Sequence, residues 1–154
     1  MTNNGLLYYE DGSIKYQGEM IDQVPHGHGV AYWENGHKWY IGEFAKGQPK
    51  GVGKYYYPNG TIRYEGETEE LQYVGKGIEY FKNGQVKFKG TFKTTPRFYY
   101  GARCYVEGHL YDESGKLRYC GTFEGDKTYS FKNGVEYLED GTIRLHGRKN
   151  FVIN

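Results

Sequence analysis

The chain has 154 residues, including 24 glycines and 18 tyrosines, and its mean hydropathy of −0.85 is low for a chain with 18% aromatic residues. Its 20 basic and 19 acidic side chains leave a net charge of +1, so no overall field would hold nucleic acid or an anionic membrane. The N-terminal stretch does not resemble a signal peptide, and no apolar run is long enough to span a membrane. We therefore expect a cytoplasmic protein with a thin, largely exposed sheet, since tyrosine can pack its ring and keep its hydroxyl hydrated.

One unit of 14 residues occurs six times along the chain. With its residues numbered as positions 1 to 14, its pattern is G-x-x-Y-x-x-[DNS]-G-x-x-[KRW]-[YFL]-x-G. Self-similarity of this kind is the signature of a repeat architecture. The units begin at Gly5, Gly29, Gly53, Gly77, Gly108 and Gly134.

Each unit has the sequence of a β-hairpin. Asp-Gly, Asn-Gly or Ser-Gly lies between two stretches rich in aromatic and β-branched residues. In the third unit, Pro58 suits the second residue of a type I turn, which leaves Asn59 next and Gly60 at a left-handed bulge. We predict an all-β protein, an elongated antiparallel meander of six hairpins. The equivalent turn glycines, also expected at positive φ, are Gly12, Gly36, Gly84, Gly115 and Gly141.

The same turn divides each hairpin into two faces. It would place Tyr56 opposite Ile62, and Lys54 opposite Tyr64. Because successive side chains of a strand alternate, positions 2, 4, 10 and 12 would form a packed face and the remaining positions a wet face. Glu79 and Lys87 then fall on the wet face.

The segments between the units contribute further apolar side chains. We expect Met20, Phe44, Phe92 and Phe123 to fold over the packed face and to form a continuous spine between the units. The whole chain, 1–154, would be one repeat domain. It would include an irregular connection over 91–107 and a C-terminal cap over 148–154, in which residues 151–153 cover the last edge.

Four features carry a family resemblance: the G-x-x-Y opening, the Asn-Gly or Asp-Gly turn, the [KR]-[YF]-x-G return, and the Glu or Thr that follows it. The units resemble MORN repeats, in particular the variant of bacterial YwqK-type antitoxins, and the resemblance covers Gly5 to Gly147. It implies a twisted antiparallel meander with a groove along one face. It also implies an immunity protein that binds and blocks a polymorphic toxin, often a nuclease or nucleic-acid deaminase.

No sequence pattern indicates an enzyme. The chain lacks the GxSxG, HExxH, P-loop and dinucleotide-binding fingerprints. His26 and His28, with His37 nearby, form the densest histidine cluster, but no third ligand has a zinc-site spacing, so we expect solvated loop histidines and no metal. Cys104 and Cys120 form no CxxC pair; redox activity is an alternative to a role as small apolar fillers. We predict neither catalysis nor a cofactor.

Aromatic side chains gather on the predicted wet face of the first three units, where both tryptophans of the chain occur. Exposed aromatic clusters are typical of protein interfaces, whose binding energy is concentrated in tryptophan and tyrosine. The alternative is a second small core covered by other parts of the chain. The candidate partner-binding residues are Tyr9, Trp33, Trp39, Ile41, Tyr55 and Tyr57.

Carboxylates gather in the stretch EGETEE between the third and fourth units. Inhibitors of nucleases often imitate phosphate with carboxylates, because the substrate site of a nuclease is basic. We therefore add Glu67, Glu69 and Glu70 to the candidate partner-binding residues. Glu65 belongs to the same acidic stretch. The alternative is a solvated acidic loop.

A basic run with interleaved aromatic residues extends from Lys82 to Arg103 and could hold single-stranded nucleic acid. The balanced net charge, and the need of the repeat itself for aromatic residues, argue against this, so we predict no nucleic-acid partner. The leading hypothesis is a cytoplasmic antitoxin that neutralises its toxin by occlusion. The alternative is a structural or adaptor scaffold that binds membrane lipid or associates with itself.

Overall fold

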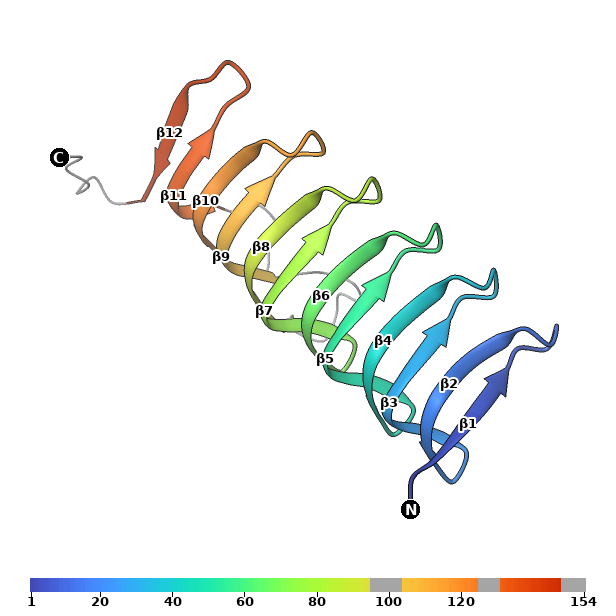
Figure 1. The fold of residues 1–154 in the computed structure, drawn as a ribbon. Coiled ribbons are helices and arrows are strands. Elements are labelled where there is room, and N and C mark those ends of the chain that lie inside the picture. The colour runs from blue at the N-terminus through green and yellow to red at the C-terminus, as the bar shows by residue number, and fades with distance from the viewer. Residues whose placement is uncertain (95–103, 125–130, 148–154) are drawn as a thin grey trace.

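The computed structural model describes residues 1–94, 104–124 and 131–147, which form a single antiparallel sheet of 12 strands. The strands follow one another across the sheet in the order of the sequence, so each hairpin is followed by the next along the molecule (Figure 1). This confirms the all-β meander. The strands are β1 (Asn3–Tyr8), β2 (Ile14–Ile21), β3 (Val24–Tyr32), β4 (Lys38–Ala45), β5 (Gln48–Tyr56), β6 (Ile62–Glu69), β7 (Gln72–Tyr80), β8 (Val86–Lys93), β9 (Cys104–Tyr111), β10 (Leu117–Phe123), β11 (Phe131–Tyr137) and β12 (Ile143–His146).

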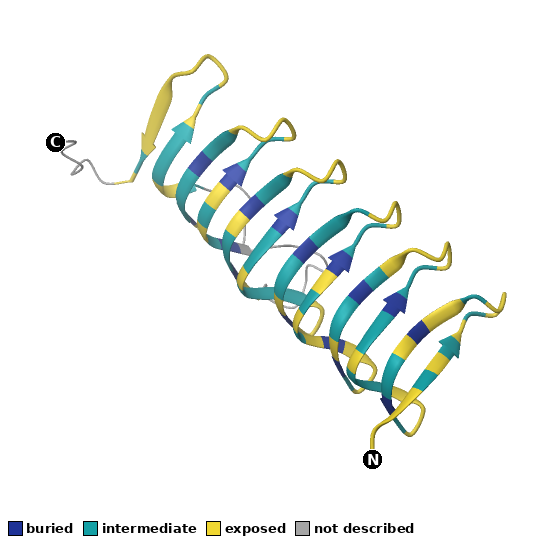
Figure 2. Cartoon of the chain, in the orientation of Figure 1, coloured by how far each residue is buried: buried dark blue, intermediate teal, exposed yellow. Residues whose placement is uncertain are grey.

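The hairpin tips have the predicted turn. In the third unit, the N–H of Gly60 donates to the carbonyl of Tyr57 (2.9 Å), and the N–H of Tyr57 donates to the carbonyl of Thr61 (2.8 Å). The φ angle of Gly60 is 88°, and those of the five equivalent glycines are 84° to 86°, so all six adopt the left-handed conformation that glycine tolerates best. The tips are exposed, and the buried residues lie farther along the strands (Figure 2).

The predicted register is wrong by one residue beyond the turn. Tyr56 faces Ile62 as expected, but Tyr55 faces Tyr64, where we expected Lys54. Arg63 is the additional residue of a β-bulge, and the first five units share this shift. Position 3, and not position 4, therefore packs beside position 12, and the position-4 tyrosines point to the opposite face.

The glycines at positions 14 and 1 of successive units face each other on adjacent strands, and they form one continuous row across the sheet from β1 to β11. We call it the glycine row. The aromatic ring at position 12 lies against each facing pair: a Cβ built on Gly77 would lie only 2.5 Å from the hydroxyl oxygen of Tyr64. That hydroxyl donates to the carbonyl of Glu67 at 2.9 Å. The row consists of Gly5, Gly18, Gly29, Gly42, Gly53, Gly66, Gly77, Gly90, Gly108, Gly121 and Gly134.

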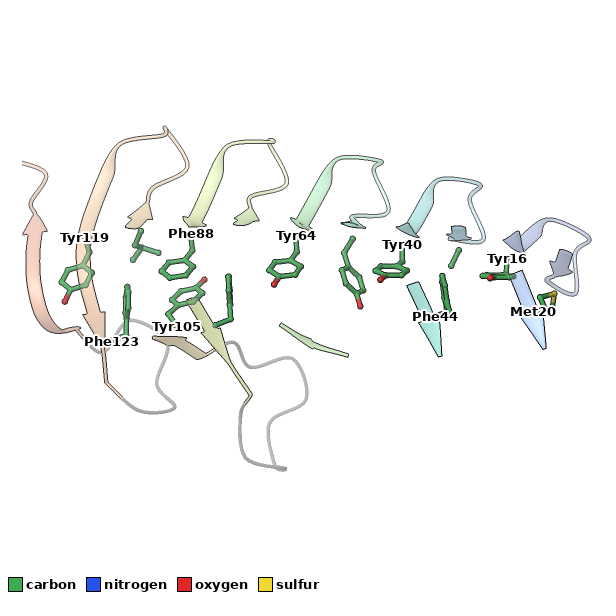
Figure 3. Close-up of a cluster of buried hydrophobic side chains, with 13 residues drawn as sticks. Tyr16, Met20, Tyr40, Phe44, Tyr64, Phe88, Tyr105, Tyr119 and Phe123 are labelled. Atoms are coloured by element: carbon green, nitrogen blue, oxygen red, sulfur yellow. The ribbon is translucent and has the colours of Figure 1, made fainter. Parts of the chain in front are cut away.

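The strands bend at the glycine row. The ring centroids of Tyr40 and Phe44 are 5.1 Å apart, whereas residues four apart on a straight strand are separated by about 13 Å. Strand β4 therefore bends at Gly42 towards the side that carries the rings. Figure 3 shows the result, a file of rings along the molecule in the order Tyr16, Tyr40, Tyr64, Phe88 and Tyr119.

The predicted spine of apolar side chains is confirmed. Met20, Phe44, Phe92 and Phe123 are all buried and belong to one core cluster with the position-12 rings. The segments that follow the first three units extend the strands and reverse in two-residue turns at 22–23, 46–47 and 70–71, where both φ angles are positive. These are the angles of type I′ turns, which match the twist of paired strands.

Part of the predicted irregular connection over 91–107 is ordinary sheet. Strands β8 and β9 pair from Phe88 with Leu110 to Lys93 with Cys104. Residues 95–103 and the predicted cap over 148–154 lie outside the described residues. In the last unit, Tyr137, Ile143 and Leu145 are exposed, so its expected packed face is not buried.

The contact between the ring and the glycine row should contribute measurably to the free energy of unfolding. We expect Gly77→Ala to lower the free energy of unfolding by about 1–3 kcal/mol, because the new methyl group meets the Tyr64 ring. In a Tyr64→Leu background the same substitution should cost clearly less. Urea denaturation of the four proteins measures the coupling, and an equal cost in both backgrounds would contradict the contact.

The tyrosine core should also make the fold sensitive to alkaline pH. Burial, and next the nearby Glu43 carboxylate, raise the pKa of Tyr40 to about 12, and burial raises the pKa of Tyr55 and Tyr64 as well. Since the pKa values in the folded state exceed the ordinary value near 10, the unfolded chain releases these protons first, and stability declines as the pH rises from 10 towards 12. Tyrosinate absorbance should then rise together with the loss of circular dichroism. Full ionisation at pH 11 with an unchanged spectrum would show that the rings are not tightly packed.

Candidate binding groove

A hollow of about 1090 Å³ crosses the middle of the sheet from Ile41 on β4 to Thr122 on β10. We call it the groove. Its side chains come from positions 2 and 13 of the units, from the residues just outside positions 1 and 14, and from Tyr111 at position 4 of the fifth unit. These residues alternate along the strands with those that contact the aromatic core, so the groove lies on the opposite face of the sheet.

The bend at the glycine row explains the shape of the groove. The side chains of Lys54, Glu65 and Ile78 stand on one side of the glycine row, and those of Val52 and Lys76 stand on the other. Because the strands bend towards the rings, the two rows diverge on the opposite face and leave the backbone of the glycines uncovered between them. Six glycines of the row accordingly line the groove: Gly53, Gly66, Gly77, Gly90, Gly108 and Gly121.

The walls combine apolar and charged groups. Val52 is 69% exposed. Beside it, the Nζ of Lys54 lies 3.4 Å from an oxygen of Glu65, and the hydroxyl of Tyr80 donates to the other oxygen of that carboxylate at 2.5 Å. Burial, followed by the contact with Glu65, raises the pKa of Tyr80 to about 12, so its hydroxyl remains a donor at physiological pH. The side chains of Lys54, Glu65 and Tyr80 are thus linked to one another in the wall of the groove.

One end of the groove holds a thiol and an imidazole. The Sγ of Cys120 lies 3.3 Å from Nε2 of His109, directly across the β9–β10 pair. Cys120 is a partly exposed wall residue, which is not the apolar filler that the sequence favoured. The side chain of Cys104 lies outside the described residues.

Family models match three stretches of the chain. Residues 16–38 and 40–62 match the MORN repeat, and residues 73–94 match the MORN repeat variant. The chain contains MORN repeats. No curated protein matches it. The first two matched ranges begin at Tyr16 and Tyr40, so each includes a position-12 ring and the glycine pair beneath it.

The MORN-repeat meander uses the predicted double-tryptophan patch largely for its own packing. The ring of Trp39 lies 6.2 Å from that of Tyr55 and 6.1 Å from that of Trp33, and it packs against the core. Tyr55 itself is buried. Ile41 is on the other face, in the groove. The β-bulge accounts for this, since it turns positions 3 and 11 towards the core.

The position-5 aromatic residues connect successive MORN units. The hydroxyl of Tyr9 donates to the carbonyl of Tyr32 (2.7 Å), and the hydroxyl of Tyr57 donates to that of Tyr80 (2.8 Å). In the same way, Nε1 of Trp33 donates to the carbonyl of Tyr56 at 3.2 Å. Tyr9, Trp33 and Tyr57 thus fix each hairpin tip to the next.

The predicted acidic residues lie on one strand and the turn that follows it. Glu65, Glu67 and Glu69 alternate along β6, so all three point to the groove face, and Glu70 is in the turn. The carboxylate of Glu67 lies beside Gly75, 2.7 Å from a Cβ built there. Its equivalent, Glu19, accepts the N–H of His28 at 2.6 Å. Glu67 therefore also takes part in the packing within its own repeat, beside Gly75.

One buried carboxylate, Glu79, is not predicted by the sequence pattern. Glu79 at position 3 is fully buried and accepts a hydrogen bond from the hydroxyl of Tyr105 at 2.6 Å, and Nζ of Lys87 lies 3.7 Å from its second oxygen. The alternation of side chains along the strands predicts a wet face for both Glu79 and Lys87. The position of the β-bulge was the missing information, because it brings Glu79 to the core side.

The histidines and lysines are dispersed. His28 lies between Glu19 and Glu43, 3.8 Å from each, and His37 contacts the carbonyl of Pro58 at 2.7 Å. Within the described ranges no three potential ligands gather into a metal site, and no helix has the length and apolar character of a membrane span. In the basic run, Lys87 is held by Glu79 and Lys89 lines the groove, so the two do not form one surface. Arg97 and Arg103 lie outside the described residues.

Because Trp39 packs against Tyr55 and the core, it should contribute to the stability of the fold. We expect Trp39→Ala to lower the free energy of unfolding by about 1.5–3 kcal/mol, since it removes apolar contact with Tyr55 and the core. The matched control is Ile41→Ala, two residues away on the groove face, with an expected loss of about 1 kcal/mol or less. Urea denaturation compares them. An unchanged urea midpoint for Trp39→Ala would contradict this packing role and would favour the prediction that Trp39 is an interface residue.

Proposed function

We propose that this MORN-repeat protein is a scaffold that binds another protein along the groove. The supporting observation is the division of labour between the two faces. The aromatic face is filled by its own rings, whereas the groove leaves Val52 and other apolar side chains uncovered on the opposite face. Apolar surface rimmed by polar groups is typical of a site of protein interaction.

We propose further that the partner is a toxin, which the scaffold neutralises by covering the surface that the toxin needs for catalysis. Two features support this form of the function. The units resemble those of the YwqK-type antitoxins. In addition, the carboxylates of Glu65, Glu67 and Glu69 occur on the groove face of one strand, which suits a toxin with a basic substrate site. Inhibition by occlusion requires no chemistry from this chain.

A substitution in the middle of the groove tests the proposal. We expect Ile78→Glu on β7 to abolish protection when the protein is co-expressed with the toxic domain encoded by the neighbouring gene, because a charge then replaces an apolar contact. Cell survival and co-elution of the purified proteins measure the effect. The wild-type protein should protect and co-elute.

The matched control is Ile143→Glu, which places the same charge at an exposed isoleucine of β12 outside the groove. It should protect as the wild type does, and circular dichroism should show that both variants are folded. A toxin that stays lethal in the presence of wild-type protein, without co-elution, excludes the antitoxin function. Flotation of the protein with liposomes would then favour a lipid-binding scaffold.

A further inference from the structure

We propose that a second copy of this chain binds at the end of the sheet, so that β12 of one copy pairs with β1 of the next and the meander continues from copy to copy. This inference goes beyond the proposed function, because it concerns the two edges of the sheet and not the groove. Three observations support it: the side chains exposed at the two ends, the residues that meet at the internal junctions between units, and the distribution of charge along the chain.

Both ends of the sheet leave apolar side chains uncovered. Among the described residues, β1 and β12 each pair with one neighbouring strand only. Three large apolar side chains of the first unit and three of the last are exposed, including Leu6 (44%) and Leu145 (56%), whereas the four middle units contain none. Strand β1 also has no charged residue, although charge commonly protects an edge strand against further pairing. Each end is therefore suited to the addition of another strand.

The internal junctions specify how two copies would meet. At each of the five junctions, positions 12, 13 and 14 of one unit face positions 3, 2 and 1 of the next. The same register, applied between copies, would extend the glycine row from Gly147 to Gly5 of the second copy. It would also place Leu145 opposite Leu7, so that an apolar pair meets on the core side of the sheet.

Leu145 departs from the repeat in a way that suits this contact. It is the one residue at position 12 that is not aromatic. The first glycine of every later unit is covered by the position-12 ring of the unit before it, but Gly5 is covered by the side chain of Met20. A ring in place of Leu145 would compete with Met20 for this glycine, whereas the smaller leucine leaves the place to Met20. The last unit is thus matched to the first.

The hairpin tips supply a matching ion pair. At the junction between the fifth and sixth units, the guanidinium of Arg118 at position 11 lies 3.9 Å from the carboxylate of Glu139 at position 6. Arg144 and Glu10 occupy the same two positions in the last and the first unit, and both are exposed. The junction between copies would bring these two side chains together in the same way.

The charge along the chain favours contact between unlike ends. Residues 1–72 contain 10 acidic and 6 basic side chains, whereas residues 73–154 contain 9 acidic and 14 basic side chains. The acidic first half of one copy therefore attracts the basic second half of another. Contact between unlike ends does not close on itself, so copies would add one after another.

Sedimentation of the full chain tests the inference. We expect the mean mass to pass that of a dimer as the concentration rises from about 2 to 200 μM, because each added copy leaves one edge open. Leu6→Lys places a charge on the β1 edge, and Leu145→Lys places one on the β12 edge. Each variant alone should stay monomeric, because every contact needs both edges.

An equal mixture of the two variants should form dimers and nothing larger, because one unaltered β12 edge and one unaltered β1 edge remain to meet. Both substituted side chains are exposed in the wild type, and circular dichroism should show that both variants are folded. The matched control is Leu71→Lys, which changes a 51% exposed leucine in the turn between β6 and β7 and should associate as the wild type does.

A wild-type chain that stays monomeric at about 200 μM would overturn the inference, and so would a mixture of the two variants without dimers. Dimers of Leu145→Lys alone would indicate contact between two β1 edges. Association of both single variants, each by itself, would place the contact outside the two edges. Either of these results also overturns the inference.

Discussion

The structure depends on one contact, an aromatic ring that lies flat against two facing glycines of adjacent strands. Any side chain at Gly66 or Gly77 would meet the ring of Tyr64 or the opposite backbone, so the pair must be glycine if the ring is to lie there. The hydroxyl of the same tyrosine is satisfied by a carbonyl three residues later. The contact therefore buries a large apolar surface without leaving a polar group unpaired, and an aromatic ring takes the same place in each of the first five units.

This contact also determines the shape of both faces. The ring at position 12 and the side chain four residues after it can meet only if the strand bends at the glycine between them, as in the 5.1 Å contact of Tyr40 with Phe44. The bend encloses the rings on one face and separates two rows of side chains on the other. The groove is thus a consequence of the way in which the core is packed. No residue of the groove is needed to create it except the glycines, whose other role is to seat the rings.

The repeat, the hairpins and the turn glycines could be predicted from the sequence because each depends on local chemistry. Gly60 is an example, since Pro58 and Asn59 already specify the turn that precedes it. The two faces could not be predicted, because they depend on the β-bulge at Arg63. The bulge depends on how Tyr55 and Tyr64 pack across the sheet, and no residue of the sequence marks it as glycine marks a turn. The equivalent bulges at Lys87 and Trp39 explain why Glu79 was assigned to solvent, and why the tryptophans were assigned to an exposed patch.

The bulge also changes where specificity can be encoded. Positions 12, 14 and 1 are constrained by the ring contact, and position 5 links one tip to the next, as in the bond from Trp33 to Tyr56. Positions 2 and 13, which flank the glycines, carry no such constraint, and they differ from unit to unit: Lys54 in the third unit is replaced by Ile78 in the fourth and by His109 in the fifth. Substitution there alters what the groove presents while the rings and glycines remain unchanged. A scaffold of this kind can acquire a new partner through groove residues alone, because its stability resides on the other face of the same sheet.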